Sequence, residues 1–293
     1  MRRHLGIPLL AVLPLITLAA CGGSSTPESG TTTSVSEIAA TAPRAGSSHR
    51  SSTALTDWPT YHRTNYRNGR ATQAAPKGPL RRVWNRSLPG AVYGEPLVVG
   101  TTMIVATERN YVYGLNARTG ATRWRARLGT PQPLSGLPCG NIDPLGVTST
   151  PAYDGPTGSV FVVAETTGGA HTLWALDPRT GAGRWHRNLD TQTNRNKLAE
   201  QQRSALLVQG GRVITTFGGL AGDCSNYVGY VTSVPTSGTG ATTSYAVPTA
   251  REAGMWSTPG AVRGPVGDKI YVASGNGAEL NGTWDKSDSV TEL

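Results

Sequence analysis

One stretch of sequence occurs twice and decides the fold. "YVYGLNARTGATRWRARLG" covers residues 111–129, and "TLWALDPRTGAGRWHRNLD" covers residues 172–190. The matching positions are Leu115 with Leu176, Thr119 with Thr180, Gly120 with Gly181, and Trp124 with Trp185, each pair 61 residues apart (176−115, for example). A unit of about 60 residues is therefore repeated, and a repeat of this length is typical of solenoids and propellers.

Two weaker copies continue the same period. Val234, in "SVPTSGTG", and Leu293, in "VTEL", occupy the position of Leu176 at spacings of 58 and 59 residues (234−176 and 293−234). Each copy contains short apolar, β-branched segments separated by glycine-rich turns and shows no helical period. The sequence therefore predicts an all-β fold, a β-propeller of four-stranded blades.

The second copy shows how one blade is built. We expect strands at about 147–153, 160–165, 172–176 and 184–189. Asp177 starts the turn between the last two, and Gly181 allows a positive φ angle there. Trp185 is placed to pack over a turn and the neighbouring blade. A single blade cannot bury both of its faces, so successive blades must stack.

The two full repeats resemble those of PQQ-like (quinoprotein-type) β-propeller proteins. "DWPTYHRTNYRNGR" (57–70) is similar to the segment that leads into such propellers. Relatives in fold include the outer-membrane assembly factor B lipoproteins and the quinoprotein alcohol dehydrogenases. The resemblance implies a ring of seven or eight blades. The chain supplies about four, plus an isolated piece resembling an outer strand, "RRVWNRSLPG" (81–90), so we expect residues 57–293 to form an incomplete propeller, truncated at its C-terminus.

The N-terminus has the features of an export signal. A basic start and an apolar core predict a signal peptide over residues 1–20. Leu-Ala-Ala-Cys (18–21) resembles a bacterial lipobox, which implies a lipid on Cys21 and the membrane as a partner. Residues 21–56 are rich in Ser and Thr and predict a flexible tether. The expected location is the outer face of the cytoplasmic membrane, or the periplasm if the source has an outer membrane. An ordinary secretory signal with a chance cysteine is the alternative.

The formal charge of +9 does not indicate a nucleic-acid partner. The basic residues are scattered, and no basic-aromatic motif is present. The five histidines show no metal-ligand spacing, so the sequence predicts no metal site built on them (His4, His49, His62, His171 and His186).

Two cysteines remain once Cys21 is assigned to lipid. Cys139 follows the last strand of the first copy, and Cys224 follows the second strand of the third copy. These two kinds of connection emerge at the same face of an up-and-down blade. In an exported protein this placement predicts a Cys139–Cys224 disulfide. Two free buried thiols are the alternative.

The resemblance also implies pyrroloquinoline quinone (PQQ) and Ca²⁺ as cofactors. "ASGNGAELNGTWDKSDSVTEL" (273–293) is similar to a Gly-Asn-Pro loop of the quinoprotein dehydrogenases. On this resemblance Asn276 is the candidate ligand of calcium and of the cofactor. Asp285 or Asp288 is the candidate catalytic base.

Several features depart from the dehydrogenase pattern. Gly277 replaces the proline, the residues around Asp285 do not match, and Glu165 lies only roughly where a ligand glutamate would be. The chain has neither a vicinal Cys-Cys pair nor a C-x-x-C-H haem motif. The alternative for this stretch is a Gly-Asn-Gly turn with solvated aspartates.

Three functional hypotheses follow. The one that the missing site residues and the tether favour is a lipid-anchored scaffold or binding protein of the cell envelope, whose partner is an envelope protein or a ligand. The second is a PQQ- and calcium-dependent oxidoreductase acting on alcohols or sugars. The third is a truncated gene product without activity. The repeat motif itself consists of packing and turn residues and carries no visible chemistry.

Overall fold

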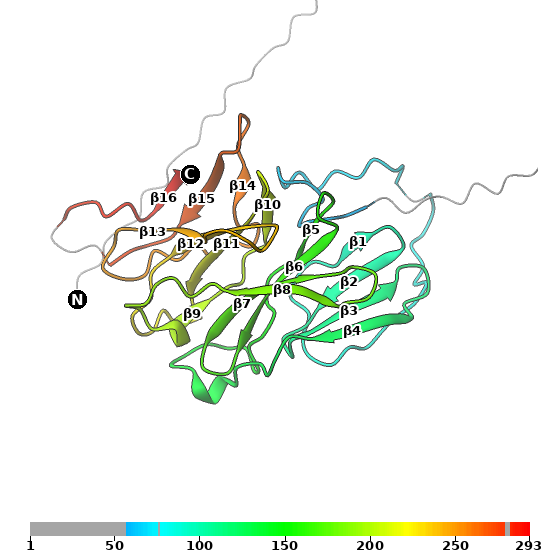
Figure 1. Cartoon of the computed structure of the whole chain (residues 1–293), viewed down its shortest axis with the longest axis horizontal. Helices are drawn as coiled ribbons and strands as arrows, with labels where there is room; N and C mark the ends of the chain where they lie inside the picture. Colours follow the sequence, from blue (N-terminus) through cyan, green and yellow to red (C-terminus); the bar gives the residue numbers. More distant parts are fainter. Residues whose placement is uncertain (1–56, 76, 279–281) are drawn as a thin grey trace, which may run out of the picture. The chain divides into compact units, whose positions relative to one another are not determined.

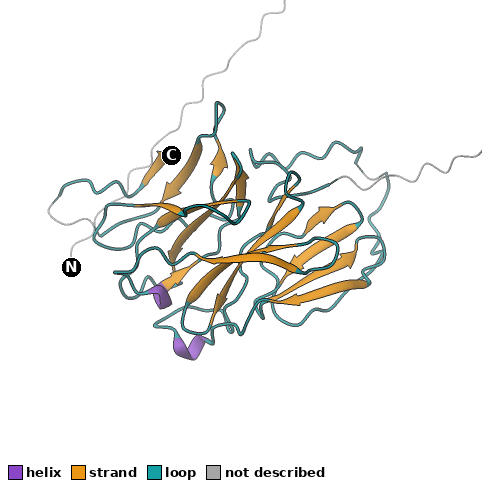
Figure 2. Ribbon diagram, viewed as in Figure 1, coloured by secondary structure: helices purple, strands orange, loops and turns teal. Residues whose placement is uncertain are grey.

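The computed structural model describes residues 57–75, 77–278 and 282–293, all within one compact unit, Ser52–Leu293. The predicted signal peptide (1–20), Cys21 and the tether (21–56) lie outside the described residues. Figure 2 shows strands and loops, with two single helical turns, η1 (Leu134–Gly136) and η2 (Lys197–Ala199). No helix in the described part of the chain is long and apolar enough to span a membrane.

The strands form four antiparallel sheets that follow one another along the chain (Figure 1). The first is β1 (Leu97–Val99), β2 (Thr102–Ala106), β3 (Tyr111–Asn116) and β4 (Thr122–Arg127); the second is β5 (Ala152–Asp154), β6 (Ser159–Thr166), β7 (Ala170–Leu176) and β8 (Gly183–Asn188). The third is β10 (Leu207–Gln209), β11 (Arg212–Gly219), β12 (Tyr230–Pro235) and β13 (Thr243–Ala246), with β9 (Glu200–Gln201) paired to the end of β11. The fourth is β14 (Val262–Arg263), β15 (Ile270–Ser274) and β16 (Ser289–Glu292). The predicted propeller blades are confirmed.

The first strand of the second blade differs from the prediction. It was expected at about 147–153, but β5 covers only Ala152–Asp154. The residues before it contact neighbouring sheets instead: Glu95 N–H donates to Thr150 Oγ1, and Leu206 N–H donates to Thr150 O. The strand is short because the carbonyl and hydroxyl groups of Thr150 accept hydrogen bonds from residues of neighbouring sheets.

Side-chain alternation on β6 explains why the sheets stack. Val160 and Val162 face the first sheet, whereas Phe161 and Val163 face the third. All four side chains are at most 2% exposed. Each such burial contributes roughly 1.5–3 kcal/mol relative to exposure in water, and β6 gains it on both faces. A third apolar cluster joins the third and fourth sheets in the same way.

A tryptophan docked on a glycine joins the outer parts of neighbouring units. In each case a Cβ atom on the glycine would lie 2.4–2.6 Å from the indole, closer than real contacts allow. The pairs are Trp84 with Gly120, Trp124 with Gly181, and Trp185 with Gly238. Two of the indole N–H groups donate to the turn beneath, from Trp84 to Ala117 O and from Trp124 to Pro178 O. The repeat Trp therefore packs over a turn of the neighbouring unit, as predicted, and the repeat Gly leaves the space that its indole occupies.

Residues 81–90 have the expected Trp but form no strand, because no described strand pairs with them. Trp84 and Leu88 pack on Val105, Tyr113 and Leu115 of the first sheet. This segment is therefore held by side-chain packing rather than by a ladder of backbone hydrogen bonds.

The segment 57–70 crosses the first strands of all four sheets. Trp58 bridges β1 at Val98, and the β5 residue Tyr153 donates its N–H to Pro59 O. Asn65 Nδ2 donates to Val208 O of β10, and Asn65 O accepts from the N–H of Arg263 in β14. One short segment therefore ties the four blades together at one end of their inner strands.

Arg67 is the last anchor of this segment. Its Nη2 donates to Leu206 O at 3.0 Å and to Ala261 O at 3.2 Å, and its Nη1 donates to Thr60 Oγ1 at 2.7 Å. Burial lowers the pKa of Arg67 to about 10, but leaves the guanidinium charged at neutral pH. The charged donors satisfy carbonyls of the third and fourth sheets in a site largely closed to water.

Gly181→Ala tests the docking of Trp124. Gly181 has φ +73°, and Gly211 has φ +70° with no atom within 4 Å of the place that an added methyl group would take. Gly211→Ala should therefore lower the free energy of unfolding only by the cost of backbone strain, about 1 kcal/mol. Gly181→Ala adds displacement of the indole and should lower the free energy of unfolding by roughly 2–4 kcal/mol in urea denaturation. Equal losses in the two variants would contradict the docking role.

Candidate functional site

Asn276, the candidate calcium ligand, follows β15 in an exposed turn. Its side-chain Nδ2 donates to Glu252 Oε2 at 3.1 Å, and Glu252 Oε1 accepts from the guanidinium of Arg251. The carboxylate beside Asn276 is thus already neutralised by a resident cation. Glu252 is therefore paired with Arg251 and does not supply a free carboxylate for calcium beside Asn276.

The two candidate bases have separate surroundings. Asp285 Oδ1 accepts from the N–H of Ser287 at 3.0 Å and from its hydroxyl at 2.5 Å, and these bonds lower the pKa of Asp285. Asp288 is exposed, and its N–H donates to Gly275 O. Within the described residues neither aspartate shares a hydrogen bond with Asn276, and no group of three acidic, His or Cys ligands surrounds it. We derive no step through PQQ or calcium.

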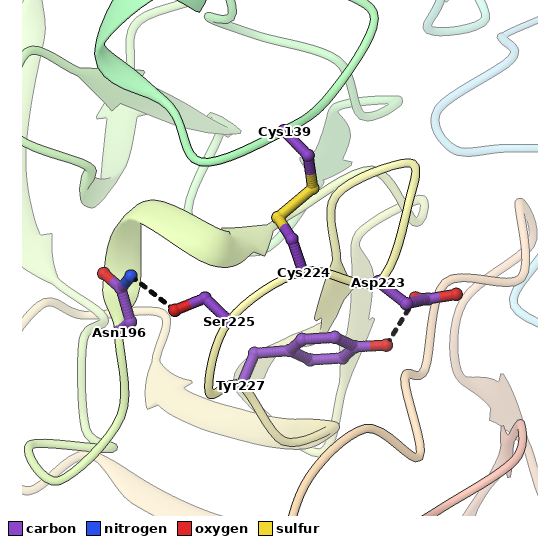
Figure 3. The surroundings of a disulfide bond; sticks show 6 residues. All are labelled: Cys139, Asn196, Asp223, Cys224, Ser225 and Tyr227. Atoms are coloured by element: carbon purple, nitrogen blue, oxygen red, sulfur yellow. Dashed lines mark hydrogen bonds between the residues drawn. A yellow bond between two sulfur atoms is a disulfide. The ribbon is translucent and has the colours of Figure 1, made fainter.

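The disulfide between Cys139 and Cys224 is confirmed, with Cα atoms 6.1 Å apart. Figure 3 shows the bond joining the connection between β4 and β5 to the loop between β11 and β12. Two hydrogen bonds hold that loop: Tyr227 OH donates to Asp223 Oδ1 at 2.6 Å, and Asn196 Nδ2 donates to Ser225 Oγ at 2.8 Å. A disulfide is typical of proteins outside the cytoplasm.

Beside this loop lies a cleft made of two adjoining hollows of about 320 and 230 Å³, which share Arg203 and Ala221. Four lining residues occupy one structural position, four residues before the first strand of each sheet: Tyr93 before β1, Thr148 before β5, Arg203 before β10 and Thr258 before β14. We call this the axial cleft. Because the position recurs, each blade contributes one side chain to the same hollow.

Trp256 forms part of the axial cleft and is 45% exposed. Its indole lies against three glycines: a Cβ atom on Gly218, Gly254 or Gly275 would be 2.8, 2.4 or 3.1 Å from the ring. The backbone of these glycines thus supports the indole, and part of the ring remains exposed to solvent. Gly275 directly precedes Asn276, so the loop predicted as a cofactor site supports this indole.

Arg203 lines the same hollow as Trp256 and supplies a positive charge there. It is exposed, and no described residue forms a hydrogen bond or ion pair with its guanidinium. Asp223, which lines the same hollow, is engaged by the hydroxyl of Tyr227. A planar guanidinium beside an open indole suits a flat, negatively charged ligand, which could stack and form paired hydrogen bonds.

Sequence reasoning did not single out Arg203 or Trp256. The lining residues recur every 55 residues (148−93, 203−148 and 258−203), whereas the repeat motifs recur at 58–61, so the register of the motifs does not mark them.

Buried carboxylates lie at the ends of the strands. Glu108 is 1% exposed, and desolvation raises its pKa to about 7, although its Oε2 accepts the N–H of Gly146 at 2.7 Å. Glu165, which the sequence placed near a cofactor ligand position, is buried against His171 instead, and desolvation raises its pKa as well.

The comparisons with known proteins agree with this fold. The sequence model of a protein family, described as outer membrane protein assembly factor BamB, matches residues 77–224, just over half of the chain. The chain belongs to this family. No curated protein sequence matches it.

Solved quinoprotein structures share the architecture. The quinohemoprotein alcohol dehydrogenase from Comamonas testosteroni has 23% identity and a TM-score of 0.55, over 76% of this chain and 36% of that one. A europium-containing methanol dehydrogenase has 20% identity and a TM-score of 0.55, over 75% of this chain and 42% of that one. The enzyme ADHIIG from Pseudomonas putida HK5 has 20% identity and a TM-score of 0.52, over 75% and 34%. At this identity the likeness shows the fold alone, and the chain spans well under half the length of each.

Removing the disulfide should destabilise the protein. The sequence separation of 85 residues gives a loss of about 4–5 kcal/mol on the chain-entropy model. We expect this loss in the free energy of unfolding when Cys139→Ser and Cys224→Ser are combined, measured in urea. The wild type in reducing agent should unfold like the variant; a variant as stable as the oxidised wild type would contradict the prediction.

The raised pKa of Glu108 predicts a dependence of stability on pH. The pKa of Glu108 is about 7 in the folded chain, and its ordinary value is 4.5. The contribution of Glu108 to the free energy of unfolding is therefore fully present below pH 4.5 and is lost as the pH rises through 7. The difference corresponds to about 3 kcal/mol. Glu108→Gln, which keeps an acceptor for Gly146, should reduce the fall in unfolding free energy between about pH 5 and 8. The exposed-site control Asp288→Asn should follow the wild type; a Glu108→Gln profile parallel to the wild type would refute the assignment.

Proposed function

We propose that this chain is a binding protein of the cell envelope, attached to the membrane through lipid on Cys21, and that it holds a flat, anionic ligand in the axial cleft. The observation that carries the proposal is that Trp256, on its glycine support, lines the same hollow as the guanidinium of Arg203, which pairs with no described residue. The disulfide supports a location outside the cytoplasm. Each of the four blades contributes one lining residue from an equivalent position, which supports the cleft as the place where a ligand binds.

Binding is favoured over catalysis because two of the three candidate site residues, Asn276 and Asp285, are engaged by other side chains, and Asp288 does not line the axial cleft. Asn276 is bound to Glu252, and Asp285 is bound to Ser287. Among the residues that line the axial cleft, the carboxylate of Asp223 accepts from Tyr227. The cleft therefore offers recognition groups without a free general base.

A PQQ-dependent oxidoreductase of alcohols or sugars is the second candidate. It is favoured by the open indole with its neighbouring cation, since PQQ is a planar tricarboxylate, and by the names of the fold neighbours. In that function Asn276 would be the calcium ligand, and Asp285 or Asp288 the base. The ion would bind Oδ1 of Asn276, whereas the Nδ2 of the same amide donates to Glu252.

Titration of the full chain with PQQ distinguishes these functions. For a binding protein we expect saturable, calcium-independent binding by calorimetry. Arg203→Ala should weaken it about tenfold or more, because a hydrogen bond to a charged group contributes about 1.5–3 kcal/mol. Trp256→Ala should weaken it as well, whereas the exposed control Arg82→Ala should bind like the wild type.

The remaining outcomes overturn the proposal. Calcium-dependent binding that Asn276→Ala abolishes, together with reduction of a dye by an alcohol or sugar, would establish the oxidoreductase. Absence of saturable binding would reject a cleft for flat anions and would leave the chain a scaffold or a product without activity.

A further inference from the structure

A second polar cluster lies in the interior between the second and third sheets, and none of its three members lines the axial cleft. His171 is the second residue of β7 and is completely buried. Asp190 follows β8, and Glu200 begins β9. One ligand atom from each of these three residues lies within 4.8 Å of the other two. Three separate segments therefore bring an imidazole and two carboxylates to one point.

The imidazole of His171 is held in one orientation. Its Nδ1 is 2.9 Å from Asp190 Oδ1, and its Nε2 is 3.2 Å from Glu165 Oε2. Glu165 is its direct partner across the β6–β7 pair, and the ring of Phe217 meets it edge-on at 5.2 Å. A carboxylate on the far nitrogen is the arrangement that orients metal-binding histidines in proteins.

Glu200 brings an unpartnered oxygen to the cluster. The residue is 1% exposed, its Oε2 accepts from Tyr230 OH at 3.1 Å, and its Oε1 has no partner among the described residues. Buried carboxylate oxygens are normally satisfied, so an orphaned one signals a missing partner.

Three carboxylates, those of Glu165, Asp190 and Glu200, surround a single imidazole. Burial lowers the pKa of His171, but Glu165 and Asp190 outweigh it and raise that pKa to about 10, so the imidazole is protonated. Burial also raises the pKa of Glu165, and that of Glu200 to about 7. Arg195 acts on Glu200 only through space, since its guanidinium donates to Asn226, Thr249 and Ala250. A small divalent cation that displaces the proton of His171 would pair with these carboxylates in the interior.

We propose that His171, Asp190 and Glu200 bind a divalent transition-metal ion of the zinc class, with Glu165 as a positioning residue for the imidazole. Nitrogen and carboxylate oxygen are ligands that such ions accept. The Asp190 side chain is 15% exposed and gives the ion a path from solvent. The bound ion would clamp β7 and β8 of the second sheet to β9 of the third. This inference does not depend on the function proposed for the axial cleft.

Metal binding by the full chain tests the proposal. After treatment with EDTA, the chain should bind one equivalent of Zn²⁺ by calorimetry, and its melting temperature should rise. Glu200→Gln and Asp190→Asn should each abolish or strongly weaken this binding. His186→Gln removes an exposed histidine on β8 and should leave it unchanged. Near-ultraviolet circular dichroism establishes that each variant is folded, and Asp190→Asn, at the half-buried position, provides a second test if Glu200→Gln does not fold.

Co²⁺ gives a separate readout for Glu165. Its visible absorption reports the ligands and the coordination geometry around the ion, and near-ultraviolet circular dichroism establishes separately that the variant is folded. Glu165→Gln should keep one equivalent of Co²⁺, alter its spectrum and weaken binding by about 10–100-fold. No saturable binding of Zn²⁺ or Co²⁺ by the wild type would overturn the proposal. If binding persists in Glu200→Gln and Asp190→Asn but is lost in His186→Gln, the ion binds a surface site, and the proposal is also overturned.

Discussion

The docking of an indole on a glycine is the constraint on which the rest of the structure depends. A single sheet cannot bury its two faces by itself, so each face must be covered by a neighbouring sheet held at a fixed spacing. Trp124 over Gly181 sets that spacing between the first two sheets, and Trp185 over Gly238 sets it between the next two. Glycine is required at these turns for two reasons: its φ angle is positive, and a methyl group would occupy the space of the ring.

Stacking at a fixed spacing also decides where ligands can be recognised. Because the blades repeat in register, the residues just before the first strands meet at one hollow, the axial cleft. The segment 57–70 contacts the first strand of every sheet, and the guanidinium of Arg67 binds the carbonyls of Leu206 and Ala261, which directly precede β10 and β14. The chain itself thus ties the first strands together, whereas residues several positions before them, Arg203 and Trp256, line the cleft.

The sequence predicted more of the fold than of the sites. The period of about 60 residues is sufficient to predict the blades, because Leu115, Leu176 and Val234 fill equivalent buried positions. Asn276 was selected by resemblance of a loop, but its neighbour Glu252 comes from a segment 24 residues earlier and pairs with Arg251. His171 belongs to no metal-ligand spacing in the sequence, because Asp190 meets it only through the pairing of β7 with β8, and Glu200 only when two sheets pack together.

By itself the sequence determined the all-β repeat, the turn chemistry of each blade and the cysteine pair, because these depend on periodicity, on local backbone geometry and on the topology of a blade. Only the tertiary structure decided which polar side chains meet. The axial cleft and the His171 cluster each combine residues from different blades, and no local spacing encodes the contact between two sheets. The physical reason is that apolar packing fixes how the sheets stack, and the polar groups take the positions that this stacking leaves them.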